Sequence, residues 1–449
     1  MTKKPGTKVG RTVDRRTALK TIGTASALVA GAAATGHWKR SFAQSNKAVE
    51  LWTTQVQPTQ LPAWKAIIGA FEKANPGITV NLTKVSSKDV MPKLTAAFVS
   101  DGQPDVVAGG NALGPASLHK GGQVHDLSNL AKDVGDFAPG MLSSYSDDGY
   151  QISLSIGLTV ISTMWARTDL LKAEGLGIPK SWDDLLTVAK RLNKGGKAGV
   201  SLPYGKTQMA AQLTGMFVRQ AGGDIIAPDG TVVFNSPGAV RALEFLKEIR
   251  PYAPSGANTY SYGETLTAFT SGNAGIGVYT GRVLVNTHTQ NPAIEDHIAA
   301  DFYPYPADGT RSWLSGYDPF YMPKGKSPPT EQAELFARWF FKPDMYVQWV
   351  HGAPGHQLPV TKTVAESDAY AANPLIKKHR ASVNKMLAIS KEAGTDLNAT
   401  PTRPANLDLG LVLNSHILAE ALQKVVVNKE PAKASVEWAH DKIAALLKK

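Results

Sequence analysis

Aromatic and neutral polar side chains gather where the chain is expected to leave its strands, and these residues are the best suited to contact a ligand. Trp52-Thr53-Thr54-Gln55 follows the first predicted strand and Gly110-Asn111 follows the third. Later Gly-rich stretches add Tyr260-Ser261-Tyr262, Tyr279-Thr280-Gly281-Arg282, Trp313 and Gly316-Tyr317-Asp318. A flat aromatic face covers the C–H face of a sugar ring, while amides, hydroxyls and charged groups hydrogen-bond its hydroxyls. The combination indicates a binding site for a sugar-like molecule.

Each of these aromatic residues could instead be a core residue. Trp64 and Trp182 lie on apolar patterns of helical spacing, so we assign both to the core. Trp52 and Trp313 are expected in loops and are the better candidates for stacking on a ligand. We therefore predict that Trp52→Ala and Asn111→Ala each weaken ligand binding while the fold stays intact.

Local catalytic and cofactor signatures are missing from the sequence. There is no GxSxG, no HExxH, no GxxxxGK[ST] and no GxGxxG opening a helix. Asp183-Asp184 is better explained as helix-start charge than as an acid/base pair. His351 and His356 are separated by a Gly-Ala-Pro-Gly turn, which is poor spacing for a metal pair. We expect no catalytic residue, no metal and no cofactor, although glycosidase carboxylates can lie far apart in sequence.

Strands and helices alternate from the start of the apolar pattern. Strands are expected over 48–52, 78–82 and 105–108, with helices over 62–74 and 88–100 between them. This βαβαβ order predicts a mainly parallel sheet covered by helices. In such sheets ligands bind beyond the carboxyl ends of the strands.

Later helices carry recognisable start signals. Ser181 with Asp184 forms a capping box, and Ser236-Pro237 starts another helix. The last helix is expected over 431–447. The segment 310–329 is rich in Gly, Pro and aromatic residues and is expected to be loop around one short strand.

Length and charge limit the possible classes of protein. The 449 residues suggest two or three domains, and the absence of Cys excludes disulfides, thiolate metal sites and a Cys nucleophile. The formal net charge is +11, but residues 1–43 hold nine Lys or Arg and one acid and so contribute +8 of it. The remaining 406 residues carry only +3, so a nucleic-acid partner is not expected.

The first 43 residues have the layout of an export signal. A basic opening precedes the weakly apolar stretch 21–36, and Ser41-Phe42-Ala43 supplies small residues for cleavage before Gln44. Arg15-Arg16 resembles a twin-arginine signal, and general secretion or an uncleaved anchor are the alternatives. We expect the mature chain to begin at Gln44 and to reside in a periplasm.

Several segments together resemble the extracellular solute-binding proteins of family 1, the sugar and polyol receptors of ABC importers. The most specific is MWARTDLLKAEGL followed by PKSWDDLLTVAKRL within 164–192. Further likeness lies in FEKANPGITV (71–80), QPDVVAGG (103–110), GGQVHDLSNL (121–130), AGIGVYTGR (274–282) and GHQLPVTKTV (355–364). The resemblance covers about 46–449.

The resemblance implies an α/β fold of the type II periplasmic binding protein kind, with two mainly parallel-sheet lobes joined by a hinge. By the family pattern, lobe 1 comprises 44–157 plus 304–342, and lobe 2 comprises 158–303 plus 343–449. The lobes of such proteins close on ligand in the cleft between them.

Contact positions as far as residue 282 are implied residue by residue. Trp52 resembles the family's first-strand aromatic, and Asn111 falls where relatives place an acidic or amide residue for hydroxyls. Thr159 sits at the lobe crossing, where relatives use a small hydroxyl. Tyr279 and Arg282 lie in a loop where many sugar binders have a Trp. The departure to Arg282 suggests a hydrogen-bond donor there instead of a stacking ring.

The second half completes the implied set. Gly316 matches a Gly at which backbone approaches ligand, and Tyr317 and Asp318 replace small residues, so the pocket is expected to be narrower. Gln357 occupies the usual Tyr position of its segment. Trp313 joins these residues as a stacking candidate.

The resemblance implies a periplasmic receptor, expected to be a monomer, that captures a carbohydrate or polyol and delivers it to an ABC permease with its ATPase. A glycerol-phosphate receptor is the first alternative. The late Arg of such receptors falls near Ser415 here, with Arg403 the nearest Arg. The alternative from another class is an exported polysaccharide-degrading enzyme, which would need two carboxylates about 5–9 Å apart in one cleft.

Overall fold

The computed structural model describes residues 48–87, 89–110, 113–138, 140–325, 329–395 and 405–448. The described residues all belong to one compact unit. The predicted export signal, Asn111 and Arg403 therefore lie outside the described residues. Within the described ranges, no helix is long and apolar enough to cross a membrane.

The first large sheet contains the three strands expected at the start of the chain. Their bounds are β1 (Ala48–Thr53), β2 (Thr79–Lys84) and β3 (Val106–Ala108), and β1 pairs in parallel with both neighbours. The sheet order is β12-β11-β3-β1-β2, with β6 (Leu154–Val160) paired to β11 (Leu314–Tyr321) and a short β12 (Gly394–Thr395). The predicted parallel βαβαβ unit is therefore confirmed, and the antiparallel β11 extends it.

Successive side chains of β1 point to opposite faces of this sheet, because the strand is pleated. Val49 and Leu51 are fully buried in the main core, which also contains Trp64 and Phe71 of α2 (Gln60–Ala74). Trp64 stacks on Phe340 of α12 (Glu331–Phe340), with ring centroids 5.3 Å apart. On the opposite face Trp52 packs with a smaller cluster formed by α3 (Val90–Val99) and α4 (Leu113–Lys120).

The second large sheet lies in the other lobe. Its order is β10-β7-β9-β8, with bounds β7 (Thr163–Arg167), β8 (Ala198–Ser201), β9 (Ala274–Val278) and β10 (Ile298–Phe302). β8 and β9 are parallel, whereas β7 runs antiparallel to β9 and β10. The helices of this lobe are α7 (Trp182–Leu192), α8 (Gln208–Gln220), α9 (Pro237–Ile249), α10 (Tyr262–Thr270), α11 (Arg282–Gln290), α17 (Arg380–Ser390), α19 (Ile417–Val426) and α20 (Ala432–Leu447).

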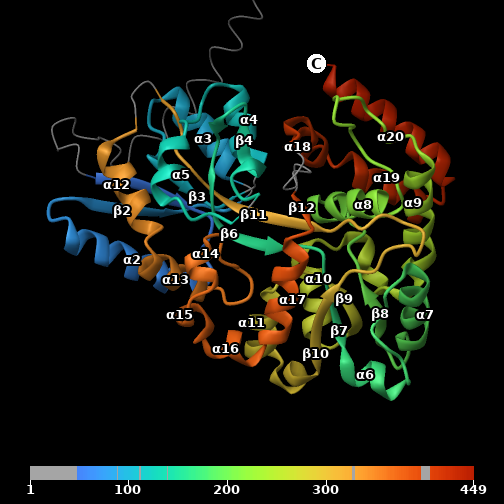
Figure 1. Ribbon diagram of the computed structural model, residues 1–449. Coiled ribbons are helices and arrows are strands. Elements are labelled where there is room, and N and C mark those ends of the chain that lie inside the picture. The colour runs from blue at the N-terminus through green and yellow to red at the C-terminus, as the bar shows by residue number, and fades with distance from the viewer. Residues whose placement is uncertain are drawn as a thin grey trace, which may run out of the picture. The chain divides into compact units, whose positions relative to one another are not determined.

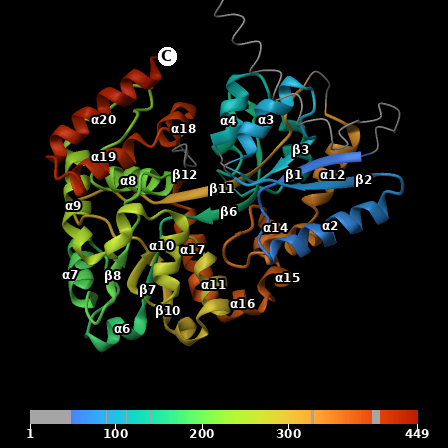
Figure 2. The same ribbon diagram turned by 180° about the vertical axis from the view of Figure 1, so that it is seen from behind.

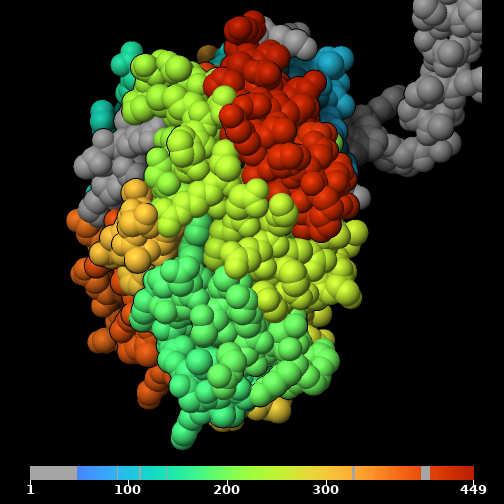
Figure 3. Space-filling model, turned by 90° about the vertical axis from the view of Figure 1, so that its right-hand side faces the viewer, coloured from blue at the N-terminus to red at the C-terminus, as the bar shows by residue number. Residues whose placement is uncertain are grey.

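The predicted helix signals act where they were expected. The hydroxyl of Ser181 accepts a hydrogen bond from the backbone N of Asp184, and the carboxylate of Asp184 accepts one from the backbone N of Ser181, so the capping box is confirmed. Ser236 caps α9 with Pro237 in its first turn. In Figure 3 the C-terminal residues, in red, lie against segments of the middle of the chain, and both α19 and α20 contact α9.

Paired strands connect the two lobes. β6 leads directly into β7, and β11 returns antiparallel to β6 after β10 (Figures 1 and 2). The segment after α13 (Pro343–His351) is a third connection, because Leu358 pairs with Leu158 of β6. Trp349 and Tyr346 of α13 both donate to the carbonyl of Ile156. The two-lobed α/β fold is confirmed, whereas the residue bounds proposed for each lobe stay predictions. The expectation of a mainly parallel sheet in both lobes is wrong for the second lobe, because β7 enters its sheet antiparallel to β9 and β10 and only β8 and β9 are parallel.

Shorter elements complete the described chain. They are α5 (Ser128–Val134), η1 (Ser143–Tyr145), β4 (Ser146–Asp147), β5 (Tyr150–Gln151), α6 (Thr168–Ala173), η2 (Arg250–Tyr252), η3 (Ser255–Thr259), η4 (Pro292–His297), α14 (Lys362–Ala365), α15 (Asp368–Ala371), α16 (Pro374–Lys378) and α18 (Leu407–Asn414). Of these, α18 contacts α4 of the first lobe as well as α8 and α20 of the second.

Candidate functional site

The carboxylate of Asp318 is the centre of a polar cluster where the two lobes meet. The register of β11 against β6 shifts between Asp318 and Pro319, and such a bulge re-aims the side chain beside it. Gln55 Nε2 donates to Asp318 Oδ1 over 2.9 Å, and Gln357 Nε2 donates to Oδ2. Amides from the first strand loop and from the third connection thus converge on one carboxylate.

Gln55 is fixed by the loop that follows β1. Its backbone N donates to Thr53 Oγ1 over 3.0 Å, and its Oε1 accepts from Gln60 Nε2 over 2.9 Å. Gly109, at the end of β3, has φ +90°, and a Cβ there would lie 2.9 Å from Gln55 Cγ. Only glycine permits this approach, because the left-handed backbone and the contact both exclude a side chain.

Gln357 is fixed by close contact with β6. Its side chain is fully buried, and a Cβ on Gly157 would lie 1.5 Å from Gln357 Oε1. Within the described residues this Oε1 has no hydrogen-bond partner. The amide therefore keeps one acceptor available beside Asp318, and an unpaired buried acceptor of this kind carries a desolvation cost.

Burial raises the pKa of Asp318 to about 6, and the amides of Gln357 and Gln55 together with the charge of Arg282 only partly oppose this effect. Within the described residues no direct ion pair joins Arg282 to Asp318, and the guanidinium of Arg282 contacts His356 instead. The site thus presents one carboxylate and one guanidinium whose charges interact without direct contact.

Arg282 begins α11, directly after the Gly-rich turn that follows β9. Its Nη2 lies 2.7 Å from His356 Nε2, and its backbone N donates to Thr280 Oγ1 over 3.3 Å. His356 Nδ1 lies 3.0 Å from the same hydroxyl. Burial, and to a lesser degree the charge of Arg282, lower the pKa of His356 well below its ordinary value, so the ring is neutral at pH 7.

Two other predicted contact residues lie in the crossing strands. Thr159 of β6 donates from Oγ1 to the carbonyl of Gly316 over 3.1 Å, and the two residues are register partners. A Cβ on Gly316 would lie 3.0 Å from Thr159 Oγ1, so the small residue is required by strand packing. Tyr317 is buried, and its ring packs edge-on against Tyr145, with centroids 5.7 Å apart.

The structure does not bring all predicted stacking residues into loops. Trp313 lies just before β11, outside any helix or strand as expected, but it is only 3% exposed. It donates from Nε1 to the carbonyl of Tyr303 and packs edge-on against Phe302 and Tyr305, so its ring is part of the core. Trp52 lies within β1 and is half-buried. Tyr279 is buried after β9, where burial raises its pKa to about 12.

Three partners of the cluster escaped the sequence analysis. Gln55 and Thr280 stand inside segments recognised as candidates, yet neither was singled out. His356 was considered only as a metal ligand. The signal that could have found Gln55 and Thr280 is their position two residues beyond a strand end, whereas the contact of His356 with Arg282 spans 74 residues and leaves no local pattern.

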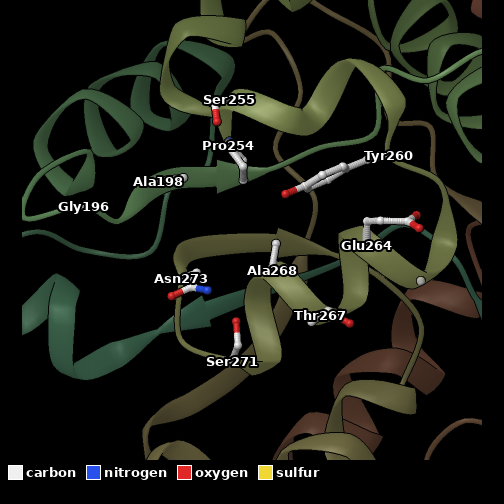
Figure 4. Close-up of a pocket in the computed structure, with 11 residues that line it drawn as sticks. Gly196, Ala198, Pro254, Ser255, Tyr260, Glu264, Thr267, Ala268, Ser271 and Asn273 are labelled. Atoms are coloured by element: carbon white, nitrogen blue, oxygen red, sulfur yellow. The ribbon is translucent and has the colours of Figure 1, made fainter.

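A separate pocket of about 580 Å³ lies in the second lobe, between α10, η3 and the start of β8. In Figure 4 Tyr260 and Asn273 border it, and Glu264 stands at its rim. The carboxylate of Glu264 accepts a hydrogen bond from the backbone of Ser261 and caps α10. Tyr260 is one of the aromatic candidates from the sequence, but none of the contact positions implied by the family resemblance lines this pocket, so we do not assign the ligand to it.

Possible metal ligands were searched over the described residues. No group of three His, Asp or Glu side chains in these ranges could hold a metal ion. Asp147 contacts His119 at 2.9 Å, and Asp184 is used by the capping box. Asp147 and Asp184 therefore both have ordinary structural partners.

Comparisons with known proteins agree with this architecture. The family model for bacterial extracellular solute-binding proteins matches residues 56–346. A putative ABC transporter periplasmic-binding protein of Escherichia coli, YcjN, is 25% identical over 423 residues, which are 90% of this chain and 94% of that protein.

Solved structures show the same fold. Maltose-bound MalE3 of T. maritima has a TM-score of 0.76 and 19% identity, over 89% of this chain and 100% of that one. A sugar transporter protein of Arthrobacter chlorophenolicus with bound laminaribiose has a TM-score of 0.75 and 20% identity, over 90% of this chain and 100% of that one. The chain belongs to the bacterial extracellular solute-binding proteins, the binding components of ABC transporters.

Proposed function

We propose that this protein binds a neutral carbohydrate or polyol between its lobes and delivers it unchanged to an ABC permease. The observation that carries the proposal is the arrangement of Asp318 and Arg282, two opposite charges with no direct ion pair between them in the described chain. A hydroxyl both donates and accepts, so a ligand with adjacent hydroxyls can donate to the carboxylate and accept from the guanidinium.

Charge balance favours a neutral ligand over a phosphorylated one. A phosphate placed beside Arg282 would also face Asp318, and like charges in a partly buried site repel strongly. Ser415, where the glycerol-phosphate alternative expects an Arg, caps the end of α18 and donates to the carbonyl of Val412. The described residues thus offer that alternative no second cation at this position.

Similar proteins support the choice of ligand class. The two solved structures compared above carry maltose and laminaribiose. We propose that Trp52, Thr159, Tyr279, Gly316, Tyr317 and Gln357 line the same cleft, together with Asn111 outside the described residues. Their aromatic, hydroxyl and amide groups suit the ring faces and hydroxyls of such ligands.

We further propose that residues 1–43 direct export to the periplasm and are removed, by the twin-arginine route. The basic charge of this segment and Ser41-Phe42-Ala43 before Gln44 support the proposal. Intact-mass measurement on protein from the native compartment should give a chain that begins at Gln44. A mass that includes residues 1–43 would contradict cleavage, and full export of the Arg15→Lys, Arg16→Lys variant would contradict the route.

A thermal-shift screen tests the ligand class, because a ligand that binds only the folded state raises the melting temperature. Maltose, laminaribiose, ribitol and glycerol 3-phosphate are the probes. We expect one of the neutral compounds to raise the melting temperature and glycerol 3-phosphate to leave it unchanged. Stabilisation by glycerol 3-phosphate alone would overturn the proposed neutrality.

Absence of turnover is a separate part of the proposal. Incubation with the stabilising sugar, followed by chromatography of the products, should recover the sugar intact. Cleavage that is abolished by replacing a specific Asp or Glu would instead support the enzyme alternative, because glycosidases work through such a carboxylate pair.

A further inference from the structure

We propose that His356 is a positioning residue that holds the Arg282 guanidinium ready for ligand and away from direct pairing with Asp318. The inference rests on the proposed binding site between the lobes. It concerns a residue from the third connection acting on a side chain of α11, 74 residues away in sequence.

The hydrogen bonds around His356 have one consistent assignment. A guanidinium only donates, so His356 Nε2, 2.7 Å from Arg282 Nη2, must be the acceptor. The proton of the neutral ring then resides on Nδ1, which donates to Thr280 Oγ1 over 3.0 Å. The backbone N of Arg282 donates to the same hydroxyl, which closes a ring of three residues.

Backbone packing holds this ring of contacts rigidly. His356 is 8% exposed, and its backbone N donates to the carbonyl of Ala353 over 3.0 Å. A Cβ on Gly281 would lie 1.8 Å from the carbonyl oxygen of Gly355, so the turn before His356 lies directly on the turn before Arg282. The imidazole therefore cannot move far relative to the start of α11.

Fixing Arg282 has a consequence for affinity. A free Arg side chain loses substantial rotamer entropy when a ligand immobilises it, and preorganisation removes part of that cost. Without His356 the guanidinium is also free to turn toward the opposite charge of Asp318. The ligand would then have to displace an ion pair, so loss of the imidazole weakens binding through Arg282.

Three variants separate positioning from packing. His356→Ala removes the acceptor, whereas His356→Gln keeps one acceptor and one donor on a side chain of similar reach. His351→Ala is the matched control, because His351 is a half-buried histidine on α13 that contacts the carbonyl of Tyr370 at 3.2 Å and not Arg282. Each of the three variants is also made in the Arg282→Ala background, so that the coupling free energy between the substituted histidine and Arg282 can be measured.

Calorimetric titration uses whichever of maltose, laminaribiose and ribitol stabilises the wild type. We expect His356→Ala to weaken binding roughly tenfold, His356→Gln to stay within about threefold of wild type, and His351→Ala to change little. In the Arg282→Ala background, His356→Ala should have no further effect. The proposal would be overturned if His356→Ala bound the ligand as tightly as the wild type, or if His356→Gln bound it as weakly as His356→Ala. It would also be overturned if His356→Ala weakened binding equally in the Arg282→Ala background.

A measurement without ligand tests the role of His356 independently of the proposed ligand class. Nitrogen-15 NMR of the imidazole in the unliganded full chain should show neutral His356 protonated on Nδ1, and Arg282→Ala should shift its Nε2 resonance. A ring protonated on Nε2, or one insensitive to Arg282→Ala, would contradict the positioning role. If no probe binds while this NMR signature holds, the ligand class fails and the His356–Arg282 contact stands.

Discussion

Asp318 is a buried carboxylate whose charged form destabilises the fold and which we propose binds the ligand. A carboxylate held in a largely desolvated place between the lobes is costly when charged, and two amides and a distant guanidinium reduce that cost without removing it. If the proposed ligand donates hydroxyl hydrogen bonds to Asp318, it would lower this cost further, and satisfying the carboxylate would supply part of the binding free energy.

Asp318→Asn should remove a pH dependence of stability. Because the pKa of Asp318 is raised to about 6, the folded chain holds a proton between pH 4 and 6 that the unfolded chain releases. The stability that this proton binding gives the folded state is therefore fully present below the pKa that Asp318 has in the unfolded chain, and it is lost as the pH rises through about 6. We expect acidification from pH 7 to 5 to stabilise the wild type over the variant by on the order of 1–2 kcal/mol. Denaturation experiments that give the same stability difference between the wild type and the variant at both pH values would contradict this.

Trp52→Ala is expected to affect both stability and binding. The indole lies on β1 and packs against the cluster around Val85 and Val90, so its loss should cost on the order of 2 kcal/mol of unfolding free energy. We predict that the variant also binds the ligand more weakly, in addition to its lower stability. Calorimetric titration at a temperature where the variant is fully folded separates the two, and undiminished affinity there would remove Trp52 from the site.

At the scale of elements, local sequence patterns predicted most of the secondary structure. Helix α2 was expected over 62–74 and spans Gln60–Ala74, and the capping residues of α7 and α9 act as predicted. These features depend on neighbours a few residues away, which a sequence displays directly.

The prediction failed where pairing over long distances decides the structure. Segment 310–329 was expected to be loop around one short strand, yet β11 spans Leu314–Tyr321 although it contains Gly316 and Pro319. Pairing with β6 outweighs the weak local preference, and Pro319 is tolerated at the bulge beside Asp318. The same pairing carries Trp313 into the core, and no pattern near His356 could reveal its contact with Arg282.

Gly281→Ala should disturb the contact between two elements. Its Cβ would lie 1.8 Å from the carbonyl oxygen of Gly355, and backbone cannot swing away as a flexible side chain can. We expect a loss of at least about 2 kcal/mol in unfolding free energy. The matched control is Gly177→Ala, where nothing lies within 4 Å of the added Cβ, and it should be close to neutral. Equal melting temperatures for the two variants would contradict this packing.

The buried carboxylate of Glu295 in η4 contacts His288 of α11, Lys378 at the end of α16 and His379 just before α17. Its burial alone would raise the pKa, but hydrogen bonds from His379, Lys378 and His288 lower the pKa to about 2. The stability that it provides is present above pH 4.5 and is lost as the pH falls toward 2. The carboxylate is thus a stabilising connection at neutral pH.

Glu295→Gln should therefore cost on the order of 2–3 kcal/mol at pH 7 and less at pH 3, measured by guanidinium denaturation. Glu392→Gln is the control, because its pair with Arg311 is 40% exposed on the Glu side and should contribute less than about 1 kcal/mol. A cost for Glu295→Gln that does not depend on pH would show that packing, not charge, matters there.

In the whole molecule, as far as the structure describes it, three connections join the two lobes and one polar cluster lies where the lobes meet. Groups from the first strand loop, from β11, from the third connection and from the start of α11 meet at Asp318 and Arg282. A ligand bound to both lobes stabilises the closed arrangement by its differential contacts with that state. Resemblance to a family predicted the lobes, whereas the particular groups that meet between them required the structure.

The most direct test of the central claim is a crystal structure of the protein with the neutral sugar or polyol that stabilises it. The account predicts ligand hydroxyls within about 3.2 Å of both the Asp318 carboxylate and the Arg282 guanidinium, with His356 still against Arg282. A ligand in the pocket beside Tyr260, or one that touches neither charged group, would contradict it.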